Sequence, residues 1–550
     1  MLRLARLLGS ERGFPRVSLL TALAALVALA LVVVVIVLVS GGASQSAPTL
    51  PPIVRRVGPE SIFTPGPPLK ANPAATLDTL KRLGVDRVRI FLGWSSIAPD
   101  PLSRVRPVFD AADPAAYPAA NWGIYDTIVR DTVARGMGLD VTLGPPPPLW
   151  ASGRGAPHPT TQTQWKPSAS AFGSFVRAVA TRYSGHYRPL GASKPLPRVG
   201  FWSIWNEPNG GFQLAPQAIR HSTVEVAPAL YRHLLDASWS ALHATGHRHD
   251  TILIGEVAPA GATVGDVPGN FAVMAPLRFV RALYCVDSSY RPLLGAAAAA
   301  RQCPTTAAGS ARFAARNPAL FHATGFADHP YPQGLPPNEP TPGEPDFAEL
   351  AEVPRLEQVL DTVQQVYGSH ARLPIYSTEF GYQTTPPDTE LGTTSPTLAA
   401  YYLNWSEYIT WRDRRMRSFD QYLLVDSPRG IFASALEFAN GKPKPGYFAY
   451  RMPIYLPVTA TIRGHPLEVW ACVRPAHYAR VRTHKAQIAR IEFRPATGGP
   501  FQTLARLKLT DRYGYFDVTQ VFPSSGSVRI AWSYPHGPTV FSRTVTVTVR

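Results

Sequence analysis

The feature that most constrains the fold is a repeated alternation between short, β-rich apolar runs and longer amphipathic segments. Such an alternation is typical of parallel βα units. Strands are predicted near 53–62 and at Arg87–Gly93, Leu139–Leu143, Val199–Trp205, Thr251–Val257, Gly325–His329, Leu373–Phe380 and Ser418–Val425. Helices are predicted at Ala74–Leu83, Tyr125–Arg135, Ala169–Tyr183, Ala229–Ala244, Phe271–Tyr284, Ala351–Tyr367 and Leu398–Arg415.

Eight strands separated by helices over residues 53–455 fit an α/β fold, a (β/α)8 (TIM) barrel with long loops. Barrels of this class run from about 200 to over 400 residues. A doubly wound open sheet is the alternative, but it usually carries a Gly-rich phosphate loop after its first strand. The sequence shows no such loop, so the barrel is favoured.

The pattern changes after Leu456, where short strand-like runs are separated by Gly, Pro, Ser and Asp. The last run, TVTVTV, alternates as a half-buried strand does. The runs are Ala486–Phe493, Thr503–Leu509, Gly514–Val518, Val528–Ser533 and Thr544–Val549. Residues 456–550 are therefore predicted to form a small C-terminal β-sandwich that packs on the barrel.

The N-terminus predicts a membrane anchor. Residues 17–39 (VSLLTALAALVALALVVVVIVLV) carry no charge, and as a helix they would span about 35 Å, enough to cross the hydrocarbon core. Four arginines precede them, so residues 1–16 are expected in the cytoplasm and the rest outside the cell. Residues 40–52 read as a linker. The alternative is a cleaved signal peptide and a secreted protein.

Charge and cysteines agree with an exterior location. Lys and Arg number 54 against 37 Asp and Glu, for a net charge of +17, which suits an anionic cell envelope. The excess is dispersed and no nucleic-acid-binding motif is present, so no nucleic-acid partner is expected. Cys285 and Cys303 are predicted to form a disulfide, with Cys472 left as a buried thiol. No His/Cys cluster indicates a metal, and no cofactor is expected.

Two carboxylates follow apolar strands: Glu207 in WSIWNEPN and Glu379 in PIYSTEFG. Polar residues at the C-terminal ends of barrel strands gather at one mouth. A pair of carboxyl groups about 5–5.5 Å apart is what a retaining glycosidase needs, one as nucleophile and one as acid/base. The sequence therefore predicts hydrolysis of a glycosidic bond.

The two strands also resemble those of glycoside hydrolase clan A, the retaining (β/α)8 glycosidases with catalytic glutamates on strands four and seven. WNEPN is most similar to family 39, and STEFG is closer to family 5. The resemblance implies that Glu207 is the acid/base and Glu379 the nucleophile. It covers residues from about 53 to 455, although only the motif strands carry it sharply.

The same resemblance implies several substrate-binding residues. Asn206 matches the asparagine that bonds the sugar 2-hydroxyl, and Arg89, with Arg87 as its rival, matches an arginine beside the nucleophile. His329 and Tyr331, in DHPY, match a His-x-Tyr pair. Trp150 is predicted to wall the site, because aromatic rings stack on sugar faces.

One departure from the clan is the lack of a tryptophan on the eighth strand. Tyr422, Asp426 or a loop residue is expected to act in its place. The predicted protein is an anchored, outward-facing glycosidase that cleaves a β-linked envelope or extracellular glycan. The alternative is a non-catalytic carbohydrate-binding protein on a degenerate barrel. Sequence alone leaves the sugar and the oligomeric state open.

Overall fold

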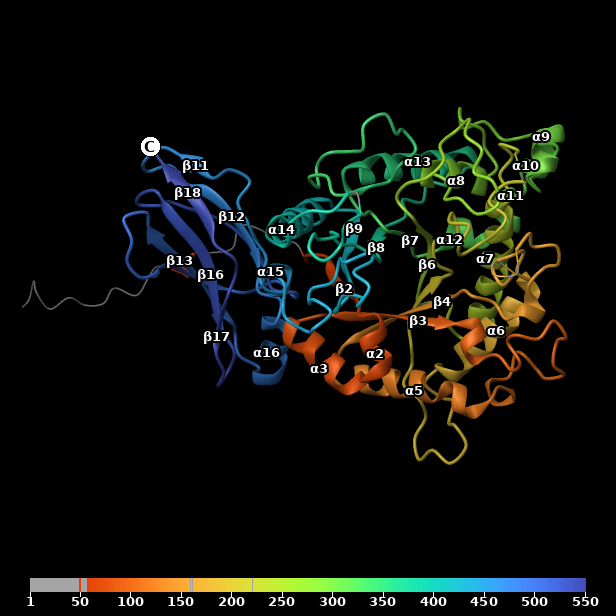
Figure 1. The fold of residues 1–550 in the computed structure, drawn as a ribbon, viewed down its shortest axis with the longest axis horizontal. Coiled ribbons are helices and arrows are strands. Elements are labelled where there is room, and N and C mark those ends of the chain that lie inside the picture. Colours follow the sequence, from red (N-terminus) through yellow and green to blue (C-terminus); the bar gives the residue numbers. More distant parts are fainter. Residues whose placement is uncertain (1–48, 51–56, 159, 161, 220, 391) are drawn as a thin grey trace, which may run out of the picture. The chain divides into compact units, whose positions relative to one another are not determined.

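A computed structural model describes residues 49–50 and 57–550, except 159, 161, 220 and 391 (Figure 1). The predicted cytoplasmic segment 1–16, the predicted span 17–39 and most of the predicted linker 40–52 lie outside the described residues. Among the residues that are described, no helix has the length and apolar character needed to cross a membrane.

Eight parallel strands close into a barrel, which confirms the predicted fold of the central region. Each strand pairs with the next in sequence, and the last pairs in parallel with the first. The strands are β2 (Glu60–Thr64), β3 (Arg87–Gly93), β4 (Gly138–Gly144), β5 (Phe201–Ile204), β6 (Thr251–Val257), β7 (Gly325–Asp328), β8 (Ile375–Ser377) and β9 (Met416–Tyr422). The first strand therefore begins later than predicted, and it ends beyond the predicted boundary.

Amphipathic helices surround the barrel strands (Figure 1). Their apolar faces and the outer faces of the strands form one large hydrophobic cluster. Side chains of Asn72, Ser168 and Ser395 cap α3, α6 and α14 by accepting bonds from backbone N–H groups that have no partner within the helix. The main helices are α3 (Pro73–Leu83), α5 (Ala119–Ala134), α6 (Ala169–Arg182), α7 (Ala227–Ala244), α8 (Pro276–Leu283), α13 (Val353–Val366) and α14 (Pro396–Arg412), and shorter ones are α2 (Pro67–Ala71), α4 (Trp94–Ile97) and α15 (Pro445–Arg451).

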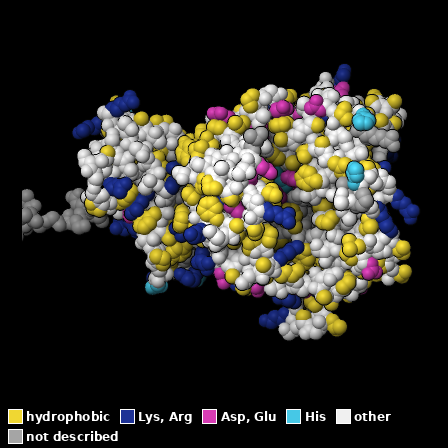
Figure 2. Space-filling model, viewed as in Figure 1, with side chains coloured by type: hydrophobic (Ala, Val, Ile, Leu, Met, Phe, Trp, Pro, Cys, Tyr) yellow, Lys and Arg dark blue, Asp and Glu magenta, His cyan; other side chains and the backbone are white. Residues whose placement is uncertain are grey.

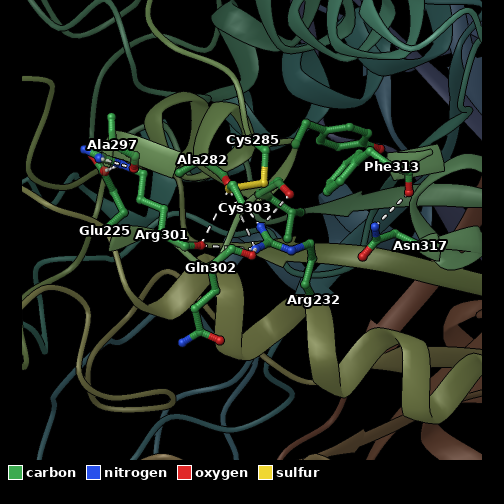
Figure 3. The surroundings of a disulfide bond; sticks show 12 residues. Glu225, Arg232, Ala282, Cys285, Ala297, Arg301, Gln302, Cys303, Phe313 and Asn317 are labelled. Atoms are coloured by element: carbon green, nitrogen blue, oxygen red, sulfur yellow. Dashed lines mark hydrogen bonds and ion pairs between the residues drawn. A yellow bond between two sulfur atoms is a disulfide. The ribbon is translucent and has the colours of Figure 1, made fainter. Parts of the chain in front are cut away.

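The longest irregular insertion lies between α8 and β7. It holds the short helices α9 (Gly295–Ala300), α10 (Ala307–Ser310), α11 (Phe313–Arg316) and α12 (Pro318–His322). A disulfide joins Cys285 to Cys303 across this insertion (Figure 3). The buried Arg232 of α7 donates to the carbonyl groups of Leu283 and Gln302, so one guanidinium ties both ends of the disulfide loop to the barrel wall.

The C-terminal part is β-sheet, as the alternating runs predict. One sheet has the order β1-β14-β13-β16-β18-β11, with β17 against β16, and the other is β10-β12-β15. Apolar side chains of both sheets belong to one shared cluster. The strands are β1 (Thr49–Leu50), β10 (Ile454–Tyr455), β11 (Ala460–Thr461), β12 (Leu467–Cys472), β13 (Ile488–Pro495), β14 (Gln502–Lys508), β15 (Tyr515–Gln520), β16 (Gly526–Ser533), β17 (Thr539–Phe541) and β18 (Val545–Val549), with helix α16 at Ala476–Thr483.

Two features of this region differ from the sequence analysis. The strand β12, which contains the buried free thiol of Cys472, has no counterpart among the predicted runs. Strand β10 pairs with β12, so Ile454 and Tyr455 belong to the second sheet although the predicted boundary places them in the barrel.

Lys and Arg side chains are dispersed over the face of the molecule drawn in Figure 2 rather than gathered into one patch. This distribution matches the dispersed basic residues of the sequence.

Candidate active site

A cavity of about 650 Å³ opens where the barrel strands end. Its walls come from the segments that follow β5, β6, β7, β8 and β9, the end at which barrel enzymes carry their chemistry. The polar side chains that line it are those of Asn206, Glu207, Gln213, Tyr331, Gln333, Glu379, Gln383 and Tyr422.

Glu207 lies just past the end of β5, the fourth barrel strand. The backbone there turns sharply, with positive φ at both Trp205 and Glu207. The Glu207 N–H donates to the carbonyl of Glu256 at 2.8 Å, which fixes this turn to the neighbouring strand. Its side chain is about 15% exposed and lines the cavity. Strained backbone in non-glycine residues is common at active sites and ligand clamps.

Glu379 lies just past β8, the seventh barrel strand, and its two oxygens have different partners. Oε1 accepts from Arg89 Nη1 at 2.7 Å, and Oε2 accepts from the Tyr331 hydroxyl at 3.1 Å. One oxygen of Glu207, one oxygen of Glu379 and one ring nitrogen of His329 all lie within 4.8 Å of one another. The structure thus brings the two glutamates, 172 positions apart in sequence, to one cavity.

Arg89 lies beneath the cavity on β3 and is fully buried. Besides Glu379 it donates from Nη2 to Glu256 at 2.6 Å and to Asn206 Oδ1 at 3.0 Å. Burial opposes its charge, but Glu256 and Glu379 outweigh burial and raise the pKa of Arg89. Arg87, the rival position, instead pairs with Glu60 at 3.0 Å, at the start of the first strand. Of the two arginines, Arg89 is therefore the one beside the carboxylates.

His329, just past β7, is fully buried between carboxylates. Its Nδ1 lies 3.0 Å from Glu207 Oε1, and its Nε2 lies 3.0 Å from Glu256 Oε2. Burial disfavours the charged ring, but Glu379, Glu207 and Glu256 outweigh it and raise the pKa of His329 to about 10. A carboxylate oxygen thus lies within hydrogen-bonding distance of each ring nitrogen.

Two further predicted residues, Tyr331 and Asn206, line the cavity. Burial and the charge of Glu379 raise the pKa of Tyr331 well above its ordinary value, so its hydroxyl remains a donor to that carboxylate. Asn206 lines the cavity directly before Glu207. It accepts from Arg89, which holds its amide in one orientation.

Trp150, predicted to wall the substrate site, does not line this cavity. Its indole N–H donates to the Pro99 carbonyl at 3.0 Å, and its ring packs edge-on against Trp94 and Phe109. The 3₁₀ turn Leu149–Ala151 that carries it packs on the hydrophobic core instead. An indole after a proline run is equally suited to core packing, so sequence position alone could not decide between the two roles.

The aromatic surface of the cavity comes from other residues. Phe432, in the loop after β9, packs edge-on against Tyr331 at 5.3 Å and Tyr422 at 5.7 Å between ring centroids. Of the residues expected to replace the absent tryptophan, Tyr422 lines the cavity, whereas Asp426 is buried and paired with Lys444 at 2.7 Å. The loop supplies a ring that no strand pattern could have located.

Glu256, near the end of β6, is a buried carboxylate that the sequence analysis missed. Its Oε2 accepts from Arg89, His329 and Thr378. Burial acts to raise its pKa, but Arg89 and His329 outweigh burial and hold the pKa of Glu256 below its usual range. The run TILIGEV ends an apolar strand with an acid, the same criterion that singled out Glu207 and Glu379, so the residue was open to prediction.

Comparisons with known proteins give structural neighbours alone. No protein-family model matches the chain, and no curated protein matches it. Among solved structures, it is similar to a family 39 glycoside hydrolase from Bacteroides cellulosilyticus WH2, at 16% identity over 84% of this chain and 79% of that one, with a TM-score of 0.45.

Two further structures have comparable coverage. A glucosidase from Croceicoccus marinus is 12% identical over 92% of this chain and 96% of its own, with a TM-score of 0.45. An endo-beta-1,4-mannanase from Thermotoga petrophila is 11% identical over 90% and 98%, with a TM-score of 0.38.

Proposed function

We propose that this protein is a retaining glycoside hydrolase that works by double displacement. The observation that carries the proposal is the convergence of Glu207 and Glu379, with oxygens within 4.8 Å, in a cavity at the C-terminal ends of the barrel strands. That separation fits a pair in which one carboxylate attacks the anomeric carbon and the other protonates the leaving oxygen.

The two glutamates have environments suited to different roles. Glu379 accepts from Arg89 and Tyr331, which stabilise it as an anion, so it attacks the anomeric carbon while the bond to the leaving oxygen breaks. Glu207 gives its proton to that oxygen. It then accepts a proton from water, whose oxygen attacks the anomeric carbon and releases the Glu379 carboxylate.

The lining of the cavity favours a neutral sugar. In the described part of the chain, Glu207 and Glu379 are the only charged side chains that line it, and no Lys, Arg or His does. An anionic sugar would meet the Glu379 carboxylate with no cation at the wall, which is unfavourable. Tyr331, Tyr422 and Phe432 offer apolar faces for sugar C–H groups. We therefore propose that the sugar is neutral and, as the sequence analysis expects, that it belongs to a β-linked glycan of the cell envelope or its surroundings.

The experiment is hydrolysis of a panel of neutral aryl β-glycosides by Glu207→Gln and Glu379→Gln. Each substitution should lower kcat by about 10²–10⁴-fold or more, because each removes a proton-transfer or nucleophilic group. Glu339→Gln, which changes an exposed acid, should keep the wild-type rate. A mechanism-based 2-fluoro-glycosyl inhibitor should label Glu379, as peptide mass spectrometry would show.

Two outcomes would contradict the proposal. Wild-type rates in both glutamine variants would remove these residues from the mechanism. Binding of oligosaccharides by the wild-type protein with no turnover on any substrate would instead favour a carbohydrate-binding protein.

A further inference from the structure

Glu256 has no place in the double displacement itself. It does not line the cavity, and its side chain is fully buried. Three donors nevertheless converge on its Oε2, from β3, from the segment after β7 and from the segment after β8. Burying a charged side chain costs free energy. The role of the Glu256 carboxylate at this position therefore requires an explanation.

The backbone is shaped to bring Glu256 to this position. The register between β6 and β7 shifts between Gly255 and Val257, so Glu256 is the extra residue of a bulge. It has φ 54°, and Gly255 before it has φ 103°. Bulges of this kind re-aim a side chain beside a functional site. Here the bulge brings the carboxylate into contact with Arg89 and His329.

The ring of His329 lies between Glu256 and Glu207 and so links the two carboxyl groups. A neutral imidazole has one donor and one acceptor nitrogen, whereas an imidazolium donates from both. If His329 were neutral with its proton on Nε2, toward Glu256, its Nδ1 would accept the acidic proton of Glu207. If the ring carries both protons, Nδ1–H donates to Glu207 Oε1, and the acidic proton must sit on the other oxygen.

We propose that Glu256 is a positioning residue whose ionised carboxylate holds His329 doubly protonated and thereby keeps the acidic proton of Glu207 off the oxygen that His329 occupies. The inference rests on the proposed function, because it assigns that proton to a leaving oxygen. The raised pKa of His329 and the lowered pKa of Glu256 agree with the geometry.

The charges around the ring are consistent with this assignment. Burial raises the pKa values of Asp328 and Asp420, which favours their neutral forms. The positive charges of Arg89 and His329 then face the carboxylates of Glu256 and Glu379. The titratable groups that face or surround the ring are Glu207, Glu256, Asp328, Tyr331, Glu379 and Asp420.

The first test is the pH profile of Glu256→Gln. Removing the negative charge favours loss of a proton from His329, so the basic limb of kcat/KM should move about 1–3 units toward lower pH. We expect kcat to fall about 10–10²-fold with KM nearly unchanged, because Glu256 does not line the cavity.

The matched control is Glu225→Gln. Glu225 is also buried and accepts from two arginines, Arg278 and Arg301, but it lies outside the cavity. This variant should lose stability without moving the limb. A basic limb that stays in place in Glu256→Gln, or that moves equally in both variants, would overturn the proposal.

The second test does not require a variant of Glu256 to fold. In the wild-type protein labelled with ¹⁵N-histidine, both ring nitrogens of His329 should stay protonated from pH 6 to 8, with the signal assigned by its loss in His329→Gln. Loss of a ring proton from His329 near pH 6.5 would overturn the inference even if the protein is a glycosidase. Conversely, wild-type rates in Glu207→Gln and Glu379→Gln would overturn the proposed function. The NMR measurement would still decide the charge of His329.

Discussion

Arg89 brings a rigid, permanently charged guanidinium beneath the cavity, and both of its terminal nitrogens have defined acceptors. Nη1 donates to Glu379, and Nη2 donates to Glu256 and Asn206. A lysine ammonium at the same place is a point charge and cannot reproduce these directions. The position of the Glu379 carboxylate therefore depends on the shape of the Arg89 side chain as well as on its charge.

Arg89→Lys should lower kcat about 10²-fold, because a small displacement of reacting groups has an effect of that size. Arg87→Lys is the matched control, since Arg87 lies on the same strand two residues away but pairs with Glu60. Steady-state kinetics on a neutral aryl glycoside would compare the two. Equal losses of activity would show that general weakening of β3, rather than contact with Glu379, causes the effect.

At the scale of elements, the bulge in β6 depends on a residue without a side chain. A Cβ at Gly255 would lie 2.6 Å from the carbonyl oxygen of Ala327 on β7, in a backbone conformation that other residues rarely adopt. Both strands would have to move apart to admit it. Because Glu256 follows Gly255 directly, its contacts with Arg89 and His329 would be displaced with the strands.

Gly255→Ala should therefore lower both the free energy of unfolding, by more than about 2 kcal/mol, and kcat. Gly246→Ala is the control, because Gly246 also has positive φ but a Cβ there would meet no atom within 4 Å. It should lose only about 1–2 kcal/mol and no activity. Urea denaturation together with kcat would test this, and equal stability losses in the two variants would contradict it.

The sequence predicted the elements better than it predicted their details. The strands β3 and β6 match their predicted bounds because apolar runs bounded by turns locate a buried strand. Helix α8 begins at Pro276, after the predicted Phe271, because proline is favoured in the first helical turn. Phe432 was beyond prediction, since its place in the cavity depends on a loop conformation that has no period in sequence.

At the scale of the whole molecule, the barrel and the C-terminal sheets share buried polar contacts. Arg474 Nη2 donates to both carboxylate oxygens of Glu407 on α14, at 2.7 Å each. The Tyr515 hydroxyl of β15 donates to Glu407 Oε1 at 2.6 Å. Aromatic residues of α14 pack against β12 and β15 around this pair. A barrel without the C-terminal sheets would expose this face and leave Glu407 unpaired.

We therefore expect the two parts to unfold in one transition, and Arg474→Met to destabilise both together. Loss of the guanidinium leaves a buried carboxylate without its partner, which costs about 3–5 kcal/mol. Adding Glu407→Met should recover most of that loss, because the pair is then replaced by apolar side chains.

Arg372→Met, which removes a largely exposed partner of Asp361, should change stability by less than about 1 kcal/mol. Guanidinium denaturation followed by tryptophan fluorescence and by hydrolysis would measure this. Two separate transitions, with activity surviving the first, would show that the barrel holds its site without the sheets.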